Sequence, residues 1–412
     1  KNLNKSFFPN KKFKSDTDIL LSMYERYGLN MMNYLNGMFS ICIYDKNKNK
    51  IFLIRDRFGI KPIYYYNNIN FVFSSEINSI KKIFSNELKL KKESISDYLS
   101  LGCTEGQNTI YEGVYKINPG EFLSYDIKSK SLKTTKWYFF KKKKNIFKNL
   151  KEAADFSENE IKKSLNLWTE SDVPICFLLS GGLDSGILSS LYSKISIDKI
   201  NTFSLGFRQK QLEKWNEINV ANTLAKKLRS NHRNIVLKVD DMLSELFKMI
   251  NILGEPYGGG LPNWYIVKEI SKKHKVAISG TGGDEIFGNY NRYFNMFNNK
   301  RTKFDKKCFK NNYFYNRNYE ADDKWKKNYL QFKFIKNKLP NKFYNMLNDE
   351  KLNNLKKNIS ILDVKTQLNN EFLYITDKFS MAHSLEVRTP YLDHELVENI
   401  YGIQEKFRLS NE

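Results

Sequence analysis

Residues 173–186, VPICFLLSGGLDSG, combine an apolar run, a glycine turn and the start of a helix. The apolar run, Val173 to Leu179, is typical of a strand that is buried on both faces of a parallel sheet. Helical spacing of apolar residues begins at Ile187, shortly after the glycines. Where a strand turns through glycines into a helix, free backbone N–H groups and the helix dipole converge on one point. The stretch therefore predicts an anion site in a parallel α/β sheet.

The side chains of the glycine turn indicate what kind of anion it binds. Gly181 and Gly182 let the backbone approach a phosphate closely. Ser180 and Ser185 add hydroxyl donors, whereas Asp184 would repel a bare phosphate, so we expect a bridging Mg²⁺. The ordinary P-loop pattern is excluded because no lysine follows the glycines. The alternative is a glycine turn that only joins a strand to a helix.

Residues 276–288, VAISGTGGDEIFG, repeat this pattern of apolar strand, glycine turn, acid and helix. Two such loops at the carboxyl ends of strands in one sheet can face each other across a nucleotide. Asp184 and Asp284 would then share Mg²⁺ and neutralise the charge that develops on the leaving group. The alternative is two unrelated glycine turns.

Length and composition limit the class of protein. The 412 residues leave room for two or three domains, and a hydrophobic content of 41% is ordinary for a globular protein. No apolar run approaches the ~18 residues of a membrane span, so we expect a cytoplasmic protein without a membrane partner. The four cysteines are far apart, which indicates reduced thiols and supports neither a zinc site nor a disulfide framework.

The net charge of +23 would ordinarily suggest nucleic-acid binding. The lysines, however, are scattered among many asparagines, isoleucines and phenylalanines, which indicates a compositional bias along the whole chain. The one true run, residues 141–144, lies in a predicted linker. We therefore do not expect nucleic acid as a partner, and a homodimer stays open.

The pattern of predicted elements changes along the chain. Residues 1–135 contain an amphipathic helix from Asp18 to Tyr27 and two consecutive hairpins, which indicates antiparallel sheets. Residues 136–150 form a basic, aromatic linker, and residues 151–412 alternate helix and strand. We predict a two-domain protein that combines an α+β antiparallel-sheet sandwich with an α/β doubly wound parallel sheet.

Three segments of the first 135 residues are LNGMF at 35–39, RDRFGIKPIYY at 55–65 and SSEI at 74–77. They resemble the glutaminase domain of glutamine-hydrolysing asparagine synthetases. The resemblance implies an N-terminal-nucleophile amidotransferase fold, in which Asp16 would bind the amino group of glutamine. Ser15 and Asp16 are also typical of a helix N-cap, and both roles are compatible.

The family nucleophile is a cysteine at residue 1, whose α-amine serves as the base. Lys1 stands at that position, and no internal cysteine has a free amine. The sequence also ends before a lysine-bearing segment that the family uses in the attack on the adenylate. We therefore expect the chain to be incomplete at both ends, and as given not to hydrolyse glutamine.

The second half carries the rest of the resemblance. SGGLDS at 180–185 resembles the pyrophosphate loop of the ATP pyrophosphatases, which cleave ATP between the α and β phosphates. The second glycine loop and TDKFSMAHSLEVRTPYLD at 376–393 resemble the asparagine synthetase domain. The resemblance implies that ATP is bound by Leu179, Ser180, Gly181, Gly182, Asp184, Ser185, Leu205, Ser279 and Gly280.

Four residues are candidate substrate contacts: Glu255 and Thr281 for the carboxylate, and Lys378 and Arg388 for phosphate. An internal ion pair between Glu386 and Arg388 is an alternative for the last of them. Thr281 stands where many asparagine synthetases have glutamate, and residues 255–262, EPYGGGLP, differ from the usual substrate segment. The glycines Gly258–Gly260 predict a more open and flexible loop there.

Together these patterns predict ATP-dependent amidation of a carboxylate through an acyl-adenylate, with ATP and Mg²⁺ as cofactors and ammonia or glutamine as nitrogen donor. L-aspartate is the default substrate, which the resemblance implies. A sugar uronate of surface-polysaccharide synthesis is a rival, because of Thr281 and the glycine loop. A basic scaffold or nucleic-acid binder built on an inactive synthetase fold is the alternative outside enzymes.

Overall fold

The computed structural model describes residues 7–68, 70–141, 143–208, 212, 216–257, 259–290, 293 and 355–409. Lys1 and Gly258, which entered the sequence predictions, lie outside these residues. Within them, no helix combines the length and the apolar character that crossing a membrane requires.

The first part of the chain contains two antiparallel sheets. The four-stranded sheet has the order β1 (Ser40–Asp45), β2 (Lys50–Arg55), β6 (Glu121–Asp126), β7 (Leu132–Lys136), and the three-stranded sheet has the order β4 (Phe71–Ser74), β3 (Tyr64–Asn67), β5 (Val114–Lys116). The helices are α2 (Asp16–Tyr27), η1 (Gly28–Asn33), α3 (Ile77–Ile83) and α4 (Lys92–Leu101). Both predicted hairpins form, as β1–β2 and β3–β4.

Side chains from the two antiparallel sheets meet in one apolar cluster. Leu53 and Leu123 of the larger sheet pack there with Tyr65 of the smaller one. Helix α2 begins at Asp16, two residues before the predicted start, because the Ser15 hydroxyl accepts a hydrogen bond from Asp18 N–H as an N-cap. This part is therefore the predicted antiparallel sandwich.

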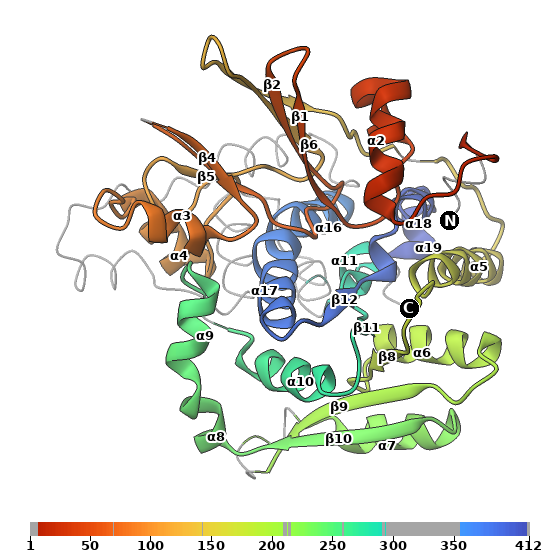
Figure 1. The fold of residues 1–412 in the computed structure, drawn as a ribbon. Coiled ribbons are helices and arrows are strands. Elements are labelled where there is room, and N and C mark those ends of the chain that lie inside the picture. The colour runs from red at the N-terminus through yellow and green to blue at the C-terminus, as the bar shows by residue number, and fades with distance from the viewer. Residues whose placement is uncertain are drawn as a thin grey trace.

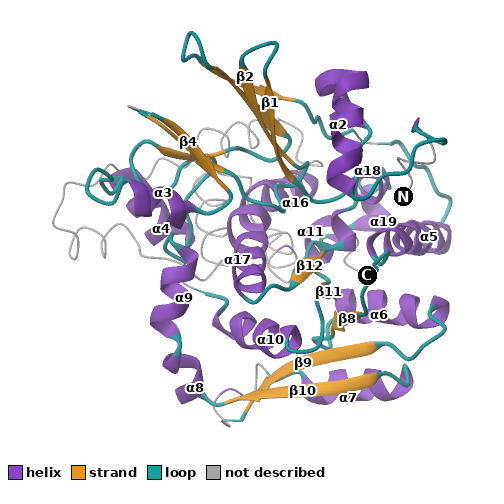
Figure 2. Ribbon diagram, in the orientation of Figure 1, coloured by secondary structure: helices purple, strands orange, loops and turns teal. Residues whose placement is uncertain are grey.

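The second part is built on a five-stranded sheet of parallel strands. The order is β10 (Asn231–Leu237), β9 (Asn201–Phe207), β8 (Ile175–Leu178), β11 (Val276–Ile278), β12 (Glu386–Arg388). Its helices in chain order are α5 (Leu150–Trp168), α6 (Leu183–Ile195), α7 (Ile218–Lys227), α8 (Val239–Ser244), α9 (Leu246–Leu253), α10 (Leu261–Ser271) and α11 (Gly283–Phe287). Figure 2 shows the antiparallel strands and the parallel strands as two separate groups.

Helices cover both faces of the parallel sheet. Cys176 and Phe177 are neighbours on β8, yet they belong to two different apolar clusters. Phe177 packs with α5 and α6 side chains such as Leu165 and Leu188, whereas Cys176 packs on the face that α10 covers through Trp264. Because both faces are buried, β8 is apolar along its length, as expected for a parallel strand. The predicted fold class is confirmed.

The chain leaves β8 toward β9 and β10 on one side, and places β11 and β12 on the other side. The strand order therefore reverses between β8 and β11. In open α/β sheets, ligands bind outside the carboxyl ends of the strands at such a switch point. Both glycine loops of the sequence follow these two strands.

A long helix lies between the two parts. It consists of α16 (Leu355–Asp363), the π-helix η4 (Val364–Leu373) and α17 (Tyr374–Ala382), and is followed by β12, η5 (Pro390–Leu392), α18 (His394–Ile400) and α19 (Glu405–Arg408). In Figure 1, α16 and α17 occupy the middle of the molecule, with the antiparallel sheets above and the parallel sheet below. Asn369 Nδ2 of η4 donates to Phe58 O at 2.8 Å, so the helix contacts the first part directly.

Candidate functional site

The two glycine loops pack against each other at the switch point. A Cβ added to Gly280 would come within 2.9 Å of Ser185 N and 3.1 Å of Asp184 Cβ. A Cβ added to Gly283 would collide with the carboxylate of Asp184. The second loop therefore needs glycine at both positions, because its backbone lies directly beside the first loop. The structure thus brings Asp184 and Asp284 to one place, as the sequence predicted.

A serine hydroxyl accepts a hydrogen bond from the backbone N–H two residues later in both loops. Ser180 Oγ accepts a hydrogen bond from Gly182 N–H at 3.2 Å and lies 3.0 Å from Ser185 Oγ. In the second loop, Ser279 Oγ accepts from Thr281 N–H at 3.2 Å and lies 2.8 Å from Thr281 Oγ1. The two loops thus share one serine-to-backbone hydrogen bond, although the left-handed glycine is Gly181 in the first loop and Gly282 in the second.

A cavity of about 550 Å³ opens over the two loops. This volume is in the range of pockets that bind cofactors. Of the residues predicted to bind ATP, Leu179, Ser180, Gly182, Asp184, Ser185, Leu205, Ser279 and Gly280 line it, together with Thr281 and Asp284. Gly181 lies beside this cavity in the left-handed conformation, with φ +91°, and shapes the turn. Sequence reasoning missed Glu217, Asn263 and Asn289, which also line the cavity.

A second cavity, of about 190 Å³, adjoins the first and shares Asp184, Asn263, Gly280, Thr281 and Asp284 with it. Its other lining residues are Gly282, Glu285, Tyr290, Phe372, Ile375 and Thr376. Neither lysine nor arginine is among the described residues that line it. Phe372, Ile375 and Thr376 come from the η4–α17 helix, about 90 residues after the second loop; Thr376 begins the segment 376–393 that carries the family resemblance, whereas Phe372 and Ile375 precede it.

Acidic side chains dominate the electrostatics of these cavities. Burial, and then the charge of Asp284, raise the pKa of Asp184 to about 7, although the Asp284 backbone N–H donates to its carboxylate. Burial also raises the pKa of Glu285 to about 7, against the effect of a 2.7 Å hydrogen bond from Tyr290 Oη. Crowded carboxylates of this kind favour a bound cation.

Asp184 and Asp284 are a suitable donor set for Mg²⁺. This ion commonly takes one or two protein carboxylates and completes its shell with substrate phosphates and water. Within the described residues, no cluster of three or more histidines, cysteines or acids forms a metal site by itself. The residues therefore fit an ion that arrives with a phosphate ligand.

Three of the predicted substrate contacts lie away from both cavities. Glu255 accepts a 2.7 Å hydrogen bond from Thr104 Oγ1 and forms an ion pair with Lys116 at 3.8 Å. Lys378 is buried against the first part of the chain, where it pairs with Glu76. Thr281, in contrast, lines both cavities.

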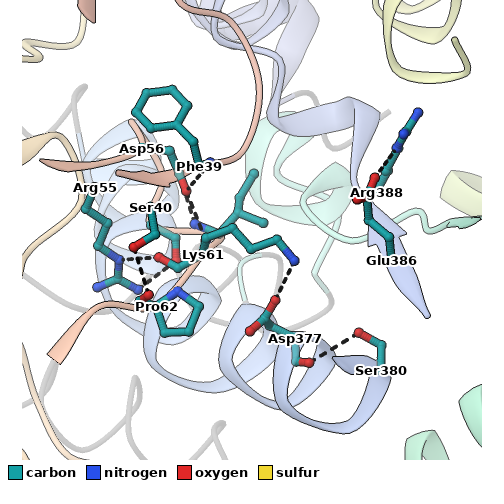
Figure 3. A network of polar contacts seen from close by, with 12 residues as sticks. Phe39, Ser40, Arg55, Asp56, Lys61, Pro62, Asp377, Ser380, Glu386 and Arg388 are labelled. Carbon is teal, nitrogen blue, oxygen red and sulfur yellow. Dashed lines mark hydrogen bonds and ion pairs between the residues drawn. The ribbon is translucent and has the colours of Figure 1, made fainter. Parts of the chain in front are cut away.

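Arg388 is the third predicted substrate contact that lies away from both cavities. Its guanidinium donates to Glu386 at 2.6 Å and to the carbonyls of Trp168 and Glu170 at 2.9 and 2.7 Å. This is the internal ion pair that the sequence left open, and Figure 3 shows it together with the polar network around Asp377. Asp16 is exposed in the first turn of α2 and lines neither cavity.

Known proteins match both parts of the chain. The family model for asparagine synthase matches residues 158–412, and that for a glutamine amidotransferase domain matches residues 3–138. Asparagine synthetase (glutamine-hydrolyzing) 1 of Bacillus subtilis is 28% identical over 436 residues, with 96% of this chain and 66% of that protein covered. A Methanocaldococcus jannaschii protein assigned as a glutamine-hydrolyzing asparagine synthetase is 31% identical over 291 residues, with 69% and 55% covered.

The chain thus spans between about half and two thirds of the length of these relatives. Among solved structures, the NH3-dependent NAD synthetase of Campylobacter jejuni aligns with a TM-score of 0.26 and 14% identity. That alignment covers 54% of this chain and 95% of the other, and it is too weak to indicate fold or function.

Proposed function

The chain belongs to the asparagine synthase family, and we propose that its two-loop cavity binds Mg·ATP and activates a carboxylate for amidation. The observation that carries the proposal is the pair Asp184 and Asp284, which two glycine loops bring together at the switch point of a parallel sheet. Nucleotide phosphates suit such loops because backbone N–H groups point into them.

The proposed reaction has two steps. A carboxylate oxygen attacks the α-phosphorus of ATP, which forms the acyl-adenylate and releases pyrophosphate. The nitrogen of ammonia then attacks the acyl carbon, the bond to AMP breaks, and the amide forms. Ser180 and Ser185 hold the first loop in its turn, and Asp184 and Asp284 would bind Mg²⁺. Bound there, the ion would neutralise charge on the departing pyrophosphate.

The adjoining cavity of about 190 Å³ is the proposed carboxylate site, because it shares the two acids and Thr281 with the ATP cavity. L-aspartate, giving L-asparagine, is our first candidate, in line with the names of the relatives. Exchange of labelled pyrophosphate into ATP, dependent on L-aspartate, tests this choice. If exchange occurs with another carboxylate but not with L-aspartate, aspartate is rejected as the substrate.

A sugar uronate is the second candidate, and one observation favours it. Aspartate keeps a free carboxylate after activation, and a lysine or arginine is the usual partner for such a group. The described lining of the cavity contains acids and neutral groups such as Asn263, Thr281 and Thr376. Hydroxyl groups of a sugar suit this lining better than a second carboxylate does. Parallel exchange assays with L-aspartate and with a nucleotide-linked uronate would decide between them.

The nitrogen source is part of the proposal. The amidotransferase match over residues 3–138 supports glutamine as the donor in the whole protein, with Asp16 as the proposed contact for the glutamine amino group. Free ammonia is the alternative nitrogen donor. The competing idea of an inactive basic scaffold predicts salt-sensitive nucleic-acid binding and no dependence on ATP.

A further inference from the structure

The helix formed by η4 and α17 forms a wall of the proposed carboxylate cavity and contacts the first part of the chain. Phe372, Ile375 and Thr376 line the cavity of about 190 Å³. Asn369 and Lys378, on either side of them in sequence, contact the first part instead. Because these residues lie within one continuous helix, a change in how it docks on the first part is expected to move the cavity wall as well.

The docking contacts of η4 are made by amide side chains. Asn369 Nδ2 donates to Phe58 O at 2.8 Å and to Gly59 O at 3.2 Å, and Asn370 Nδ2 donates to Glu105 Oε2 at 3.1 Å. The fit is close, since a Cβ added to Gly59, whose φ is +68°, would lie 2.5 Å from the Asn369 amide. These contacts set how closely η4 packs against the first part of the chain.

The docking contacts of α17 are ionic. Lys61 Nζ lies 2.8 Å from Asp377 Oδ1, and Figure 3 shows this bridge between the two parts. Lys378 pairs with Glu76, and its ammonium group also lies 5.3 Å from the ring centroid of Tyr64. The Lys378 side chain is 1% exposed, whereas that of Glu76 is 42% exposed. Removing the partner carboxylate would leave a buried ammonium group without its ion pair, which is costly.

The backbone between these contacts is unusual. Val364–Leu373 is a π-helix of ten residues, a conformation that is rare and that occurs mostly as single turns, often at functional sites. Such a segment must be held by contacts outside itself. The first part of the chain supplies several of them, immediately before and after the residues that line the cavity.

We propose that Lys378 is a positioning residue for the carboxylate cavity, acting through its ion pair with Glu76. The pair fixes α17 and thereby sets the positions of Ile375 and Thr376, which face the substrate. The kinetic side of this inference rests on the proposed function, whereas its structural side does not. Carboxylate affinity is thus set in part by a residue on the far side of the interface.

The test uses Glu76→Gln, which changes a partly exposed residue outside both cavities. We expect the KM for the carboxylate to rise by about tenfold while the KM for ATP changes less than about twofold, because only one wall moves. Amide hydrogen exchange in residues 372–376 should rise by at least about threefold. Glu121→Gln is the matched control, a carboxamide change in the same part of the chain at a side chain that accepts a hydrogen bond from Asn118 Nδ2, and it should alter neither value.

A charge swap provides a second test. Glu76→Lys and Lys378→Glu should each raise the carboxylate KM, and their combination should recover much of the loss because it restores an ion pair. A structural role without positioning predicts lower thermal stability with unchanged KM values. Unchanged KM and unchanged amide exchange in Glu76→Gln would overturn the inference. Should the unmodified chain exchange pyrophosphate with no carboxylate, the proposed function fails, and the amide-exchange comparison alone decides this inference.

Discussion

The two-loop cavity and the interface of the η4–α17 helix use carboxylates in opposite ways. In the cavity, acids lie near acids, and burial raises the pKa of Asp184 and of Glu285 to about 7. At the interface, two acids face lysines, in the pairs Lys61–Asp377 and Glu76–Lys378, and the pair Lys116–Glu255 also joins the first part to the rest of the chain. Crowded acids cost stability until a ligand brings a cation, whereas paired acids stabilise the fold without a ligand. The comparison separates groups that serve a ligand from groups that serve the structure.

The largest expected effect comes from the acids of the two-loop cavity. Asp184→Asn or Asp284→Asn should lower carboxylate-dependent pyrophosphate exchange by about 100-fold to 1,000-fold, because each removes charge aimed at the phosphates. Thermal unfolding of the ligand-free variants should show no loss of stability. A variant that keeps exchange but loses stability would show that these acids support the fold and do not bind the ligand.

The next effect, and the largest loss of stability, comes from the ion pair between Lys378 and Glu76 at the helix interface. Lys378→Met should lower the free energy of unfolding by at most about 3 kcal/mol, since it breaks a buried pair but leaves a partly exposed Glu76 that water can reach. Denaturant unfolding measures this value. A loss within experimental error would show that the pair contributes nothing to the interface.

The comparison also predicts a pH dependence. The pKa of Asp184 is about 7 in the folded protein and 3.8 for an ordinary aspartate, so between these pH values the unfolded chain releases a proton that the folded protein keeps. This contribution to stability is complete below about pH 4 and is lost as the pH rises to about 7. Asp184→Asn should therefore become more stable than the unmodified protein across this window, by up to about 4 kcal/mol, because each pKa unit corresponds to about 1.4 kcal/mol. A gap that does not change with pH would contradict the raised pKa.

The smallest expected effect comes from an exposed ion pair, which serves as a reference for the interface pairs. Lys162 and Glu158 form an exposed ion pair at 2.6 Å on α5. Lys162→Gln should change the free energy of unfolding by less than about 0.5 kcal/mol, because water and salt screen the pair. A larger loss would mean that exposed pairs in this protein cannot serve as a reference for the interface pairs.

Sequence reasoning found the parts of the site that are contiguous in the chain. Both glycine loops and their acids follow the ends of strands, and local pattern is enough to recognise such positions, whereas Leu205 was implied by the family resemblance. The antiparallel and parallel parts were also predictable, because hairpins and alternating helices and strands have distinct periods. The confirmed fold class follows from these local signals.

The same reasoning could not find the wall that η4 and α17 contribute. Phe372 and Thr376 reach the cavity only through tertiary packing, and no spacing in the sequence indicates it. Lys378 and Arg388 carry the right charge for phosphate, but the structure satisfies them with Glu76, Glu386 and backbone carbonyls. Charge type is visible in a sequence, whereas the partner that neutralises it is not.

The central claim is that the two-loop cavity joins a carboxylate to the α-phosphate of ATP. Turnover of a carboxylate that carries heavy oxygen, with Mg·ATP and ammonia, tests it directly by mass spectrometry of the products. One labelled oxygen should appear in the phosphate of AMP and none in pyrophosphate. Label in inorganic phosphate or pyrophosphate, or ATP cleavage without any transfer of label, would contradict it.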